Sequence, residues 1–506
     1  MRLDQRKMGV LLTYVSEVIK ILTTLVYTPL MLRLLGDSEF GLYQTVSSTV
    51  AYLSLLSLGF GSAYVRYHSR YRVKDDEDGI TRLNGMFMLV FCAMSLICLV
   101  AGGVMIGNAR GIFGDKLTGA ELQQSKLMMA VLILSMAVTF PNSVFNCYVT
   151  AHEKFIFQKL LIVAQNLLNP CLTLPLLFLG YGSVAVVTVS AVLTLVVFVC
   201  NLYFCLKKLG MKFSFRGLEF GLLKEMAAFT FFIFLNQIID QVNWAVDKLL
   251  LTRMIGTAIV ATYSVGAQIN SLYIQMSTAV SSVFIPKVNQ IVASSDDNRA
   301  LTRLMAKVGR IQFIILALIL TGFVFFGKPF IALWGGADKG DAYYVALLLM
   351  IPMSVPLVQN LGIEIQRAKN KHRVRSVVYA CLAVGNVILS IILIPYWGVI
   401  GAALGTTVSL LCGNVVFMNF YYHKGLGLDM ISFWKEILKI VPAVAVACLF
   451  GAGYSYFVTV NGWMLLLISV AMYAVVYAIA MWLLGLNSYE KQLIGKMLQK
   501  VNGGKR

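Results

Sequence analysis

The stretch Arg33-Leu-Leu-Gly36-Asp-Ser-Glu-Phe-Gly41-Leu-Tyr43 returns in outline later in the chain. Its Arg, Gly and Tyr recur as Arg253, Gly256 and Tyr263, which is an offset of 220 residues. At this offset segment 20–71 lies over segment 240–291 without a gap, and apolar runs fall on apolar runs. A long internal repeat of this kind decides the architecture of the whole chain.

A second set of matches supports the internal repeat. Basic and glycine positions of the first half fall on equivalent positions of the second half at an offset of 216 residues. These are Lys159, Gly182 and Lys208, which coincide with Arg375, Gly398 and Lys424. The sequence therefore predicts two similar halves.

The composition places both halves in a membrane. The chain has 506 residues, of which 59% are hydrophobic and only 13% are charged. Apolar runs of about 20 residues, the length that spans a bilayer as a helix, recur from one end to the other. The prediction is an all-α polytopic membrane protein.

The net charge of +19 follows the membrane and does not indicate nucleic-acid binding. Alternate connecting segments are rich in Lys and Arg, for example 66–82, 207–224, 287–310 and 367–375. The segments between them, such as 180–183 and 395–398, are short and nearly uncharged. Because cytoplasmic loops carry the excess of Lys and Arg, both termini are expected in the cytoplasm.

The apolar runs predict about 14 transmembrane helices. The first half has spans near 8–35, 40–65, 83–107, 126–150, 158–180 and 182–206, and the second near 225–254, 257–285, 309–334, 342–366, 374–396 and 398–422. Two more follow near 437–459 and 461–485, without a partner in the repeat.

These spans predict three parts: a first lobe at 1–210, a second lobe at 211–429, and a final part at 430–506 with two helices and a basic cytoplasmic tail. Six helices precede the second copy, so the two lobes have the same orientation. In transporters built this way the substrate site lies between the lobes near the bilayer midplane.

A polar stripe runs along the predicted helix 225–254. It consists of Asn236, Asp240, Asn243 and Asp247, and it is widened by Gln237, Gln241 and Lys248. The first four residues fall within roughly 60° of one another on a helix. A charged residue costs about 2.5 to 3.5 kcal/mol to insert, so this face must meet protein or water and not lipid.

Lys20 is the repeat counterpart of Asp240. Two interpretations of this relationship stay open. The cation and the anion can form a buried pair that locks the lobes together, or they can face a hydrated cleft that takes substrate and a coupling ion. The second interpretation is favoured, because two carboxylates and several amides exceed what one ion pair requires.

Further polar residues fit a lined cavity, among them Gln268 in the span 257–285 and Glu364 in the span 342–366. Each alone is more simply explained by hydrogen bonding between helices. Arg33 and Arg253 lie at the ends of their helices, where extension to the lipid headgroups is the default expectation. The cysteines and histidines show no ligand spacing, so neither metal nor cofactor is expected.

The run from Pro29 to Tyr43, followed by Leu58-Gly-Phe-Gly-Ser-Ala-Tyr-Val-Arg66, resembles the start of Wzx-like polysaccharide flippases. These belong to the multidrug/oligosaccharidyl-lipid/polysaccharide exporter superfamily. The resemblance implies a transporter of the bacterial cytoplasmic membrane that works by alternating access. It would move an undecaprenyl-pyrophosphate-linked oligosaccharide to the outer leaflet, driven by a proton or sodium gradient.

Substrate residues are nominated on charge and depth, because the family has no short signature to transfer. Cations suit a pyrophosphate and amides suit sugars. The nominated substrate residues are Lys20, Arg33, Lys248, Arg253, Asn236, Asn243 and Gln268, and the nominated ion-coupling residues are Asp240, Asp247 and Glu364.

Two other functions compete with the flippase. A multidrug or metabolite cation antiporter of the same superfamily would use the acidic residues to bind an organic cation, and the cations at cavity depth argue against it. A membrane enzyme would need a clustered site, usually on a large loop. The longest connecting segment, Pro286 to Val308, is too short for a catalytic domain, so no enzymatic activity is expected.

Overall fold

The structure is a computed structural model that describes residues 5–57, 60–217, 220–295, 297–369, 371, 373–488, 490–492 and 495. These residues form helices and connecting segments and include no β-strand. Among them, ten helices are long and apolar enough to cross a membrane. The predicted all-α polytopic fold is therefore confirmed.

The helix count is consistent with the predicted number of about 14. Two of the ten candidate spans, Val15–Ser57 and Val374–Gly425, each contain a glycine with a non-helical backbone, Gly36 and Gly398. Each span therefore consists of two helical segments. Two further long helices, Phe220–Met254 and Thr257–Ser282, lie outside the ten.

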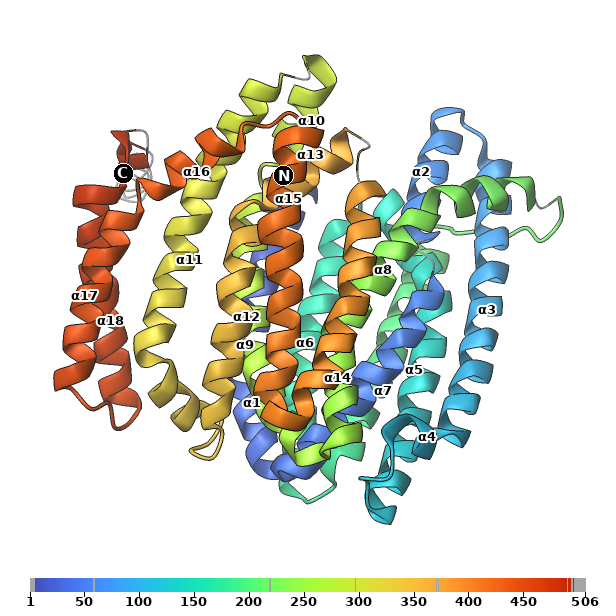
Figure 1. Cartoon of the computed structure of the whole chain (residues 1–506). Helices are drawn as coiled ribbons and strands as arrows, with labels where there is room; N and C mark the ends of the chain where they lie inside the picture. The colour runs from blue at the N-terminus through green and yellow to red at the C-terminus, as the bar shows by residue number, and fades with distance from the viewer. Residues whose placement is uncertain are drawn as a thin grey trace, which may run out of the picture. The chain divides into compact units, whose positions relative to one another are not determined.

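The chain divides into two compact units, Met1–Ser264 with Val387–Ala402, and Val265–Asn386 with Ala403–Arg506. The first half of the chain and the helix after it supply α1 (Gln5–Val50), α2 (Phe60–Val73), α3 (Glu77–Gly107), α4 (Ala109–Phe113), α5 (Gly119–Ala151), α6 (Phe155–Phe178), α7 (Gly182–Tyr203) and α8 (Phe220–Met254) (Figure 1). We call the unit that contains Met1–Ser264 unit 1, and the unit that contains Val265–Asn386 unit 2. The predicted lobe boundaries at 210 and 429 stay predictions.

The rest of the chain is helical as well. Its helices are α9 (Thr257–Ser282), α10 (Ile285–Ser294), α11 (Asn298–Trp334), α12 (Gly340–Val358), α13 (Asn360–Ala368), α14 (Arg373–Leu410), α15 (Met418–Phe420), α16 (Met430–Leu438), α17 (Val441–Phe457) and α18 (Trp463–Ala480). Short 3-10 or π-helical turns extend several of them, at Ala51–Ser57, Phe204–Lys208, Leu411–Phe417, Tyr421–Gly425 and Met481–Gly485.

The glycines of the repeat have positive φ in both copies. Gly36 has φ of 73° and Gly256 has φ of 136°, and each separates the first long helix of its copy from the second. Gly182 and Gly398 have φ of 67° and 53°. Residues with a Cβ rarely adopt positive φ, so glycine lets the chain reverse direction within a few residues. Glycine therefore recurs at these positions of the repeat because the turns require positive φ.

The sixth helix of each copy also ends in the same way, in a π-helical turn. The turns are Phe204–Lys208 and Tyr421–Gly425. In the first, the backbone N–H of Leu209 donates to the carbonyl of Phe204 over 3.1 Å, and in the second, Leu426 donates to Tyr421 over 3.1 Å. The two copies therefore share local hydrogen bonding as well as hydropathy.

Small residues bring helices of unit 1 close together, which is how helices pack without a hydrophobic driving force between them. A Cβ atom on Gly102 of α3 would lie 2.5 Å from a methyl group of Ile133 on α5. The adjoining core is rich in aromatic rings, among them Phe87, whose ring centroid lies 4.9 Å from that of Tyr64. Unit 1 thus has a tightly packed interior beside the polar face described below.

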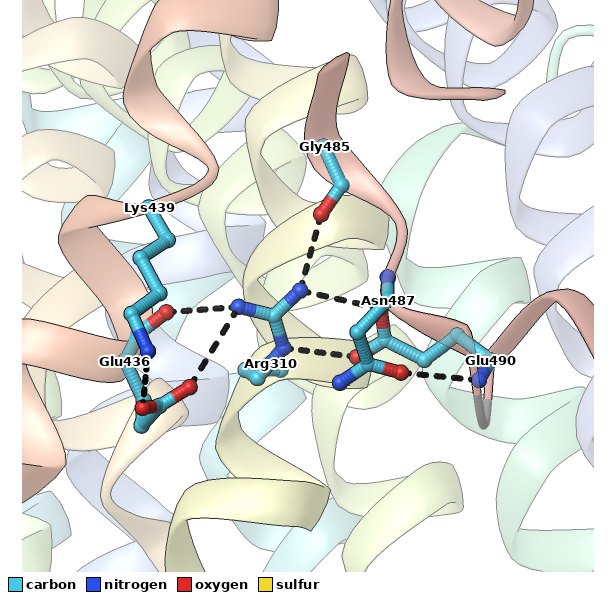
Figure 2. A network of polar contacts seen from close by, with 6 residues as sticks. All are labelled: Arg310, Glu436, Lys439, Gly485, Asn487 and Glu490. Carbon is cyan, nitrogen blue, oxygen red and sulfur yellow. Dashed lines mark hydrogen bonds and ion pairs between the residues drawn. The ribbon is translucent and has the colours of Figure 1, made fainter. Parts of the chain in front are cut away.

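In unit 2, a buried arginine joins α11 to α16 and to the chain after α18 (Figure 2). The Arg310 side chain is 4% exposed, and its Nε and Nη2 donate to the two carboxylate oxygens of Glu490 over 2.7 and 2.9 Å. It also donates to the backbone carbonyls of Glu436, over 2.7 Å, and Gly485, over 2.8 Å. A guanidinium supplies donors in this fork-shaped arrangement, which lysine cannot reproduce.

Candidate functional site: two polar faces of one helix

The second half of α8 has two polar faces, which sequence analysis treated as one stripe. Gln241, Lys248 and Thr252 follow spacings of 7 and 4 and therefore share one side of the helix. Asp247 precedes Lys248 and points about 100° away from it. The two faces have different neighbours within unit 1.

The face with Lys248 meets the second segment of α1, residues 37–50. The Lys248 ammonium donates to Oε1 of Gln44 over 3.0 Å. Nearer the end of α8, the hydroxyl oxygens of Thr45 and Thr252 lie 2.6 Å apart, and both residues are fully buried. This contact joins the second helix of one repeat copy to the first helix of the other.

The face with Asp247 is closed by hydroxyl groups. Asp247 is 2% exposed, so solvent does not satisfy its carboxylate. Its Oδ2 accepts from the Tyr263 hydroxyl over 2.6 Å, and its Oδ1 accepts from Ser390 over 3.2 Å. Hydrogen bonds to a charged acceptor are stronger than those between neutral groups, which allows this carboxylate to be buried.

The first copy of the repeat has an analogous arrangement without the charge. The counterpart of Asp247 at the offset of 220 is Tyr27, and the Tyr27 side chain lies near Tyr43 and Thr173. Tyr43 is in turn the counterpart of Tyr263. The carboxylate is therefore a feature of the second copy only.

Other nominated residues of α8 are less fully defined. The side chains of Asn236 and Asp240 lie outside the described residues, so the relationship between Lys20 and Asp240 stays a prediction. Asn243 is partly buried.

The nominated cations of unit 1 are exposed, apart from Lys248, which is partly buried. The Lys20 side chain is exposed on α1, about 20 Å along the helix from Arg33. Arg33 and Arg253 are exposed near the ends of their helices. A Cβ atom on Gly114 would lie 2.9 Å from Cγ of Arg253, so the stem of Arg253 passes close to the turn after α4.

Two nominated residues belong to unit 2. Gln268 is partly buried on α9. Glu364 on α13 forms an ion pair with Arg367 one helical turn later, with Oε1 and Nη1 2.8 Å apart. Its side chain is 18% exposed, so this pair is a local helical contact with access to solvent. Its predicted role in ion coupling stays a prediction.

A carboxylate in unit 1 that was not predicted from the sequence, that of Glu121, contacts residues of both repeat copies. Oε1 of Glu121 accepts from the hydroxyls of Ser38, over 2.5 Å, and Thr257, over 2.7 Å. Thr118 and Glu121 form a capping box at the start of α5, and this Thr-x-x-Glu pattern can be read from the sequence. The pattern predicts a helix start, however, and not the contacts with Ser38 and Thr257.

The described side chains of unit 1 include groups suited to binding a charged, hydroxyl-rich molecule. Cationic and amide side chains can hold an anionic, hydroxyl-rich molecule, and a buried carboxylate can exchange a proton or approach a small cation. Among the described residues, no group of three or more His, Cys, Asp or Glu side chains could hold a metal ion.

Comparison with known proteins identifies the family. The family described as polysaccharide biosynthesis protein matches residues 7–292, which is more than half of the chain. The uncharacterized membrane protein EpsK of Bacillus subtilis is 23% identical over 498 residues, covering 94% of each chain. The probable flippase AglR of Haloferax volcanii is 28% identical over 181 residues, covering 34% of this chain and 37% of AglR.

Solved structures show the same fold. The lipid II flippase MurJ in an inward closed conformation superposes with a TM-score of 0.75 at 16% identity, covering 96% of this chain and 99% of MurJ. An inward-facing multidrug resistance MATE family transporter gives a TM-score of 0.67 at 14% identity, covering 83% of this chain and 99% of that transporter. The resemblance predicted from the sequence is therefore confirmed, and the chain belongs to the family of polysaccharide biosynthesis proteins.

Proposed function

We propose that the protein is a flippase that moves an undecaprenyl-pyrophosphate-linked oligosaccharide from the cytoplasmic to the outer leaflet of the cell membrane. Family membership and the relation to the probable flippase AglR support this class of transport. Transport proceeds by alternating access and is driven by a proton or sodium gradient. Both termini lie in the cytoplasm, as the distribution of Lys and Arg indicates.

The exposed side chain of Lys20 is the observation that carries the proposal. Lys20 lies inside the candidate span Val15–Ser57, where a cation exposed to hydrocarbon is costly and one exposed to a water-filled cavity is tolerated. A pyrophosphate needs such cations, and its sugars need amides such as Asn243 and Gln44. The prenyl chain can stay in the bilayer beside the apolar helices.

A multidrug cation antiporter is the second candidate, because a MATE transporter shares the fold. The two candidates make opposite demands on charge. An organic cation would be repelled by Lys20 and Lys248, whereas a pyrophosphate would be attracted to them.

Reconstitution separates the two candidates. The purified chain is placed in liposomes that contain undecaprenyl-pyrophosphate-linked oligosaccharide, and an impermeant glycosidase reports the sugars that reach the outside. We expect the sugars to become accessible at least about tenfold faster than in protein-free liposomes, with no gradient-driven accumulation of ethidium. Ethidium transport without oligosaccharide transport would replace the flippase with the antiporter.

A further inference from the structure

Three side chains meet at the end of unit 1 where Gly36 and Gly256 turn the chain. Ser38 lies just after the turn in α1, Glu121 lies in the first turn of α5, and Thr257 is the first residue of α9. The hydroxyls of Ser38 and Thr257 both donate to Oε1 of Glu121, over 2.5 and 2.7 Å. Their two hydroxyl oxygens lie 2.8 Å apart.

This cluster joins the two repeat copies. Ser38 and Glu121 belong to the first copy and Thr257 to the second. Glu121 is held by its own copy, because its Oε2 accepts from the backbone N–H and the hydroxyl of Thr118, both over 2.9 Å. The carboxylate is therefore a fixed acceptor, and Thr257 is the group that can approach it or leave it.

The backbones below the cluster are in direct contact. A Cβ atom on Gly41 would lie 1.9 Å from the carbonyl oxygen of Thr257, so only glycine allows the second segment of α1 to approach α9 this closely. One turn further along α1, Thr45 meets Thr252. Below the Glu121 carboxylate, the contacting groups named here are hydroxyls, a glycine and a backbone carbonyl, and none of these groups carries a charge that separation would leave unpaired.

We propose that Ser38, Glu121 and Thr257 form a latch that closes the predicted outer end of unit 1 and releases in every transport cycle. The inference rests on the proposed function, because alternating access requires contacts between the repeat copies to break at this end. When the latch opens, water can replace each hydroxyl-to-carboxylate hydrogen bond, so the contact is reversible. A second contact at the same end, between Gln124 and Ser183, lies wholly within the first copy and has no reason to break.

A reversible crosslink tests the latch in the full chain, with its nine cysteines replaced by alanine. In the variant Ser38→Cys/Thr257→Cys, the sulfurs replace oxygens that lie 2.8 Å apart, within reach of a disulfide bond of about 2.05 Å. We expect the oxidised variant to lose oligosaccharide flipping at least about tenfold, and dithiothreitol to restore it.

The matched control is Gln124→Cys/Ser183→Cys, whose parent side chains form a hydrogen bond of 3.0 Å between Nε2 and the hydroxyl oxygen. Because cysteine is shorter than glutamine, both pairs are also closed with a short bifunctional methanethiosulfonate linker. We expect the linked control to flip at the unchanged rate, because α5 and α7 belong to the same copy. The latch would be overturned if fully crosslinked Ser38→Cys/Thr257→Cys flipped oligosaccharide as fast as the same variant does with its thiols reduced. Failure of the reduced pair to crosslink at all would also overturn it.

A second measurement separates the latch from the substrate assignment. Thr45 is fully buried behind the latch, so Thr45→Cys added to the crosslinking pair reports opening through reaction with an impermeant maleimide. The labelling is read at residue 45 alone, by peptide mass spectrometry, because the two reduced crosslinking thiols react as well. We expect labelling from outside in the reduced protein and none in the oxidised protein. Glu121→Ala without the crosslinking pair should speed the labelling of Thr45→Cys. If Thr45→Cys is labelled in the reduced protein and not in the oxidised protein, but no oligosaccharide is transported, only the proposed substrate is refuted. If Thr45→Cys is labelled equally in the reduced and the oxidised protein, the latch is refuted.

Discussion

Asp247 is a carboxylate enclosed by two hydroxyl groups, and this environment gives it a structural role beside any role in coupling. Tyr263 donates to it over 2.6 Å and Ser390 over 3.2 Å. We expect Asp247→Asn to lower the free energy of unfolding by about 1 to 3 kcal/mol, because the charge-assisted hydrogen bonds weaken. Thermal unfolding in detergent measures this, and Tyr263→Phe is the matched change on the donor side.

The two carboxylates Asp240 and Asp247 should differ in their effect on ion-coupled transport. Asp240→Asn is expected to uncouple flipping from the ion gradient, whereas Asp247→Asn is expected to keep most of the coupling. If Asp247→Asn unfolds like the wild type but loses its response to the gradient, Asp247 is the coupling residue and the structural assignment is wrong.

His68 makes the stability of unit 1 depend on pH. It lies on α2 beyond the predicted span 40–65, it is fully buried, and its ring centroid is 5.1 Å from that of His152. Burial, together with the neighbouring His152 and Arg72, lowers the pKa of His68 to about 4. Burial also lowers the pKa of His152.

The His68 imidazole therefore binds a proton less readily in the folded chain than in the unfolded chain. The free energy of unfolding should be constant above pH 6.5 and should fall by about 2 to 3 kcal/mol as the pH drops from 6.5 toward 4. Melting curves in detergent across this range measure the loss, and His68→Phe should flatten it. An equal loss in His68→Phe would show that other groups cause the acid sensitivity.

At the scale of elements, Arg310 helps to hold α16 and the chain after α18 against α11, beside the apolar cluster that packs α17 and α18 on the same helix. Arg310→Met leaves the buried carboxylate of Glu490 without its cation, which should cost about 3 to 5 kcal/mol. The double variant Arg310→Met/Glu490→Met should be less destabilised than Arg310→Met alone, because no buried charge remains. Limited proteolysis of the α17–α18 region and thermal unfolding report both changes.

The matched control is the ion pair of Arg110 and Asp115, which has the same charges in an exposed setting, with side chains 75% and 85% exposed. Asp115→Asn should change the free energy of unfolding by no more than about 1 kcal/mol. Equal effects of Arg310→Met and Asp115→Asn would contradict the role assigned to Arg310.

The elements of the fold could be predicted because helices of this length and apolarity follow directly from local sequence. The equivalent turns could also be predicted, since Gly36 and Gly256 carry their own conformational preference. The orientation of individual side chains could not. Lys248 and Asp247 are adjacent in sequence, and only the packing of α1 and of residues 387–402 decides that one meets Gln44 and the other meets Ser390. Glu121 was missed for the same reason, because its partners are 83 and 136 residues away.

At the scale of the whole molecule, we expect the two repeat copies to present cations to an anionic lipid-linked sugar. Substrate and latch have separate requirements in this account. We expect Lys20 to act through its charge on the substrate, and the cluster around Glu121 to control access.

Flipping by Lys20 variants in proteoliposomes tests this account most directly, with the impermeant glycosidase as the reporter and an imposed proton or sodium gradient. Lys20→Gln should lower the initial rate at least about tenfold while the protein stays folded, because the pyrophosphate loses a cation, and Lys20→Arg should retain part of the rate. Lys208→Gln, which removes an exposed cation from the turn after α7, should transport like the wild type. Wild-type flipping by folded Lys20→Gln would contradict the assignment of the substrate site.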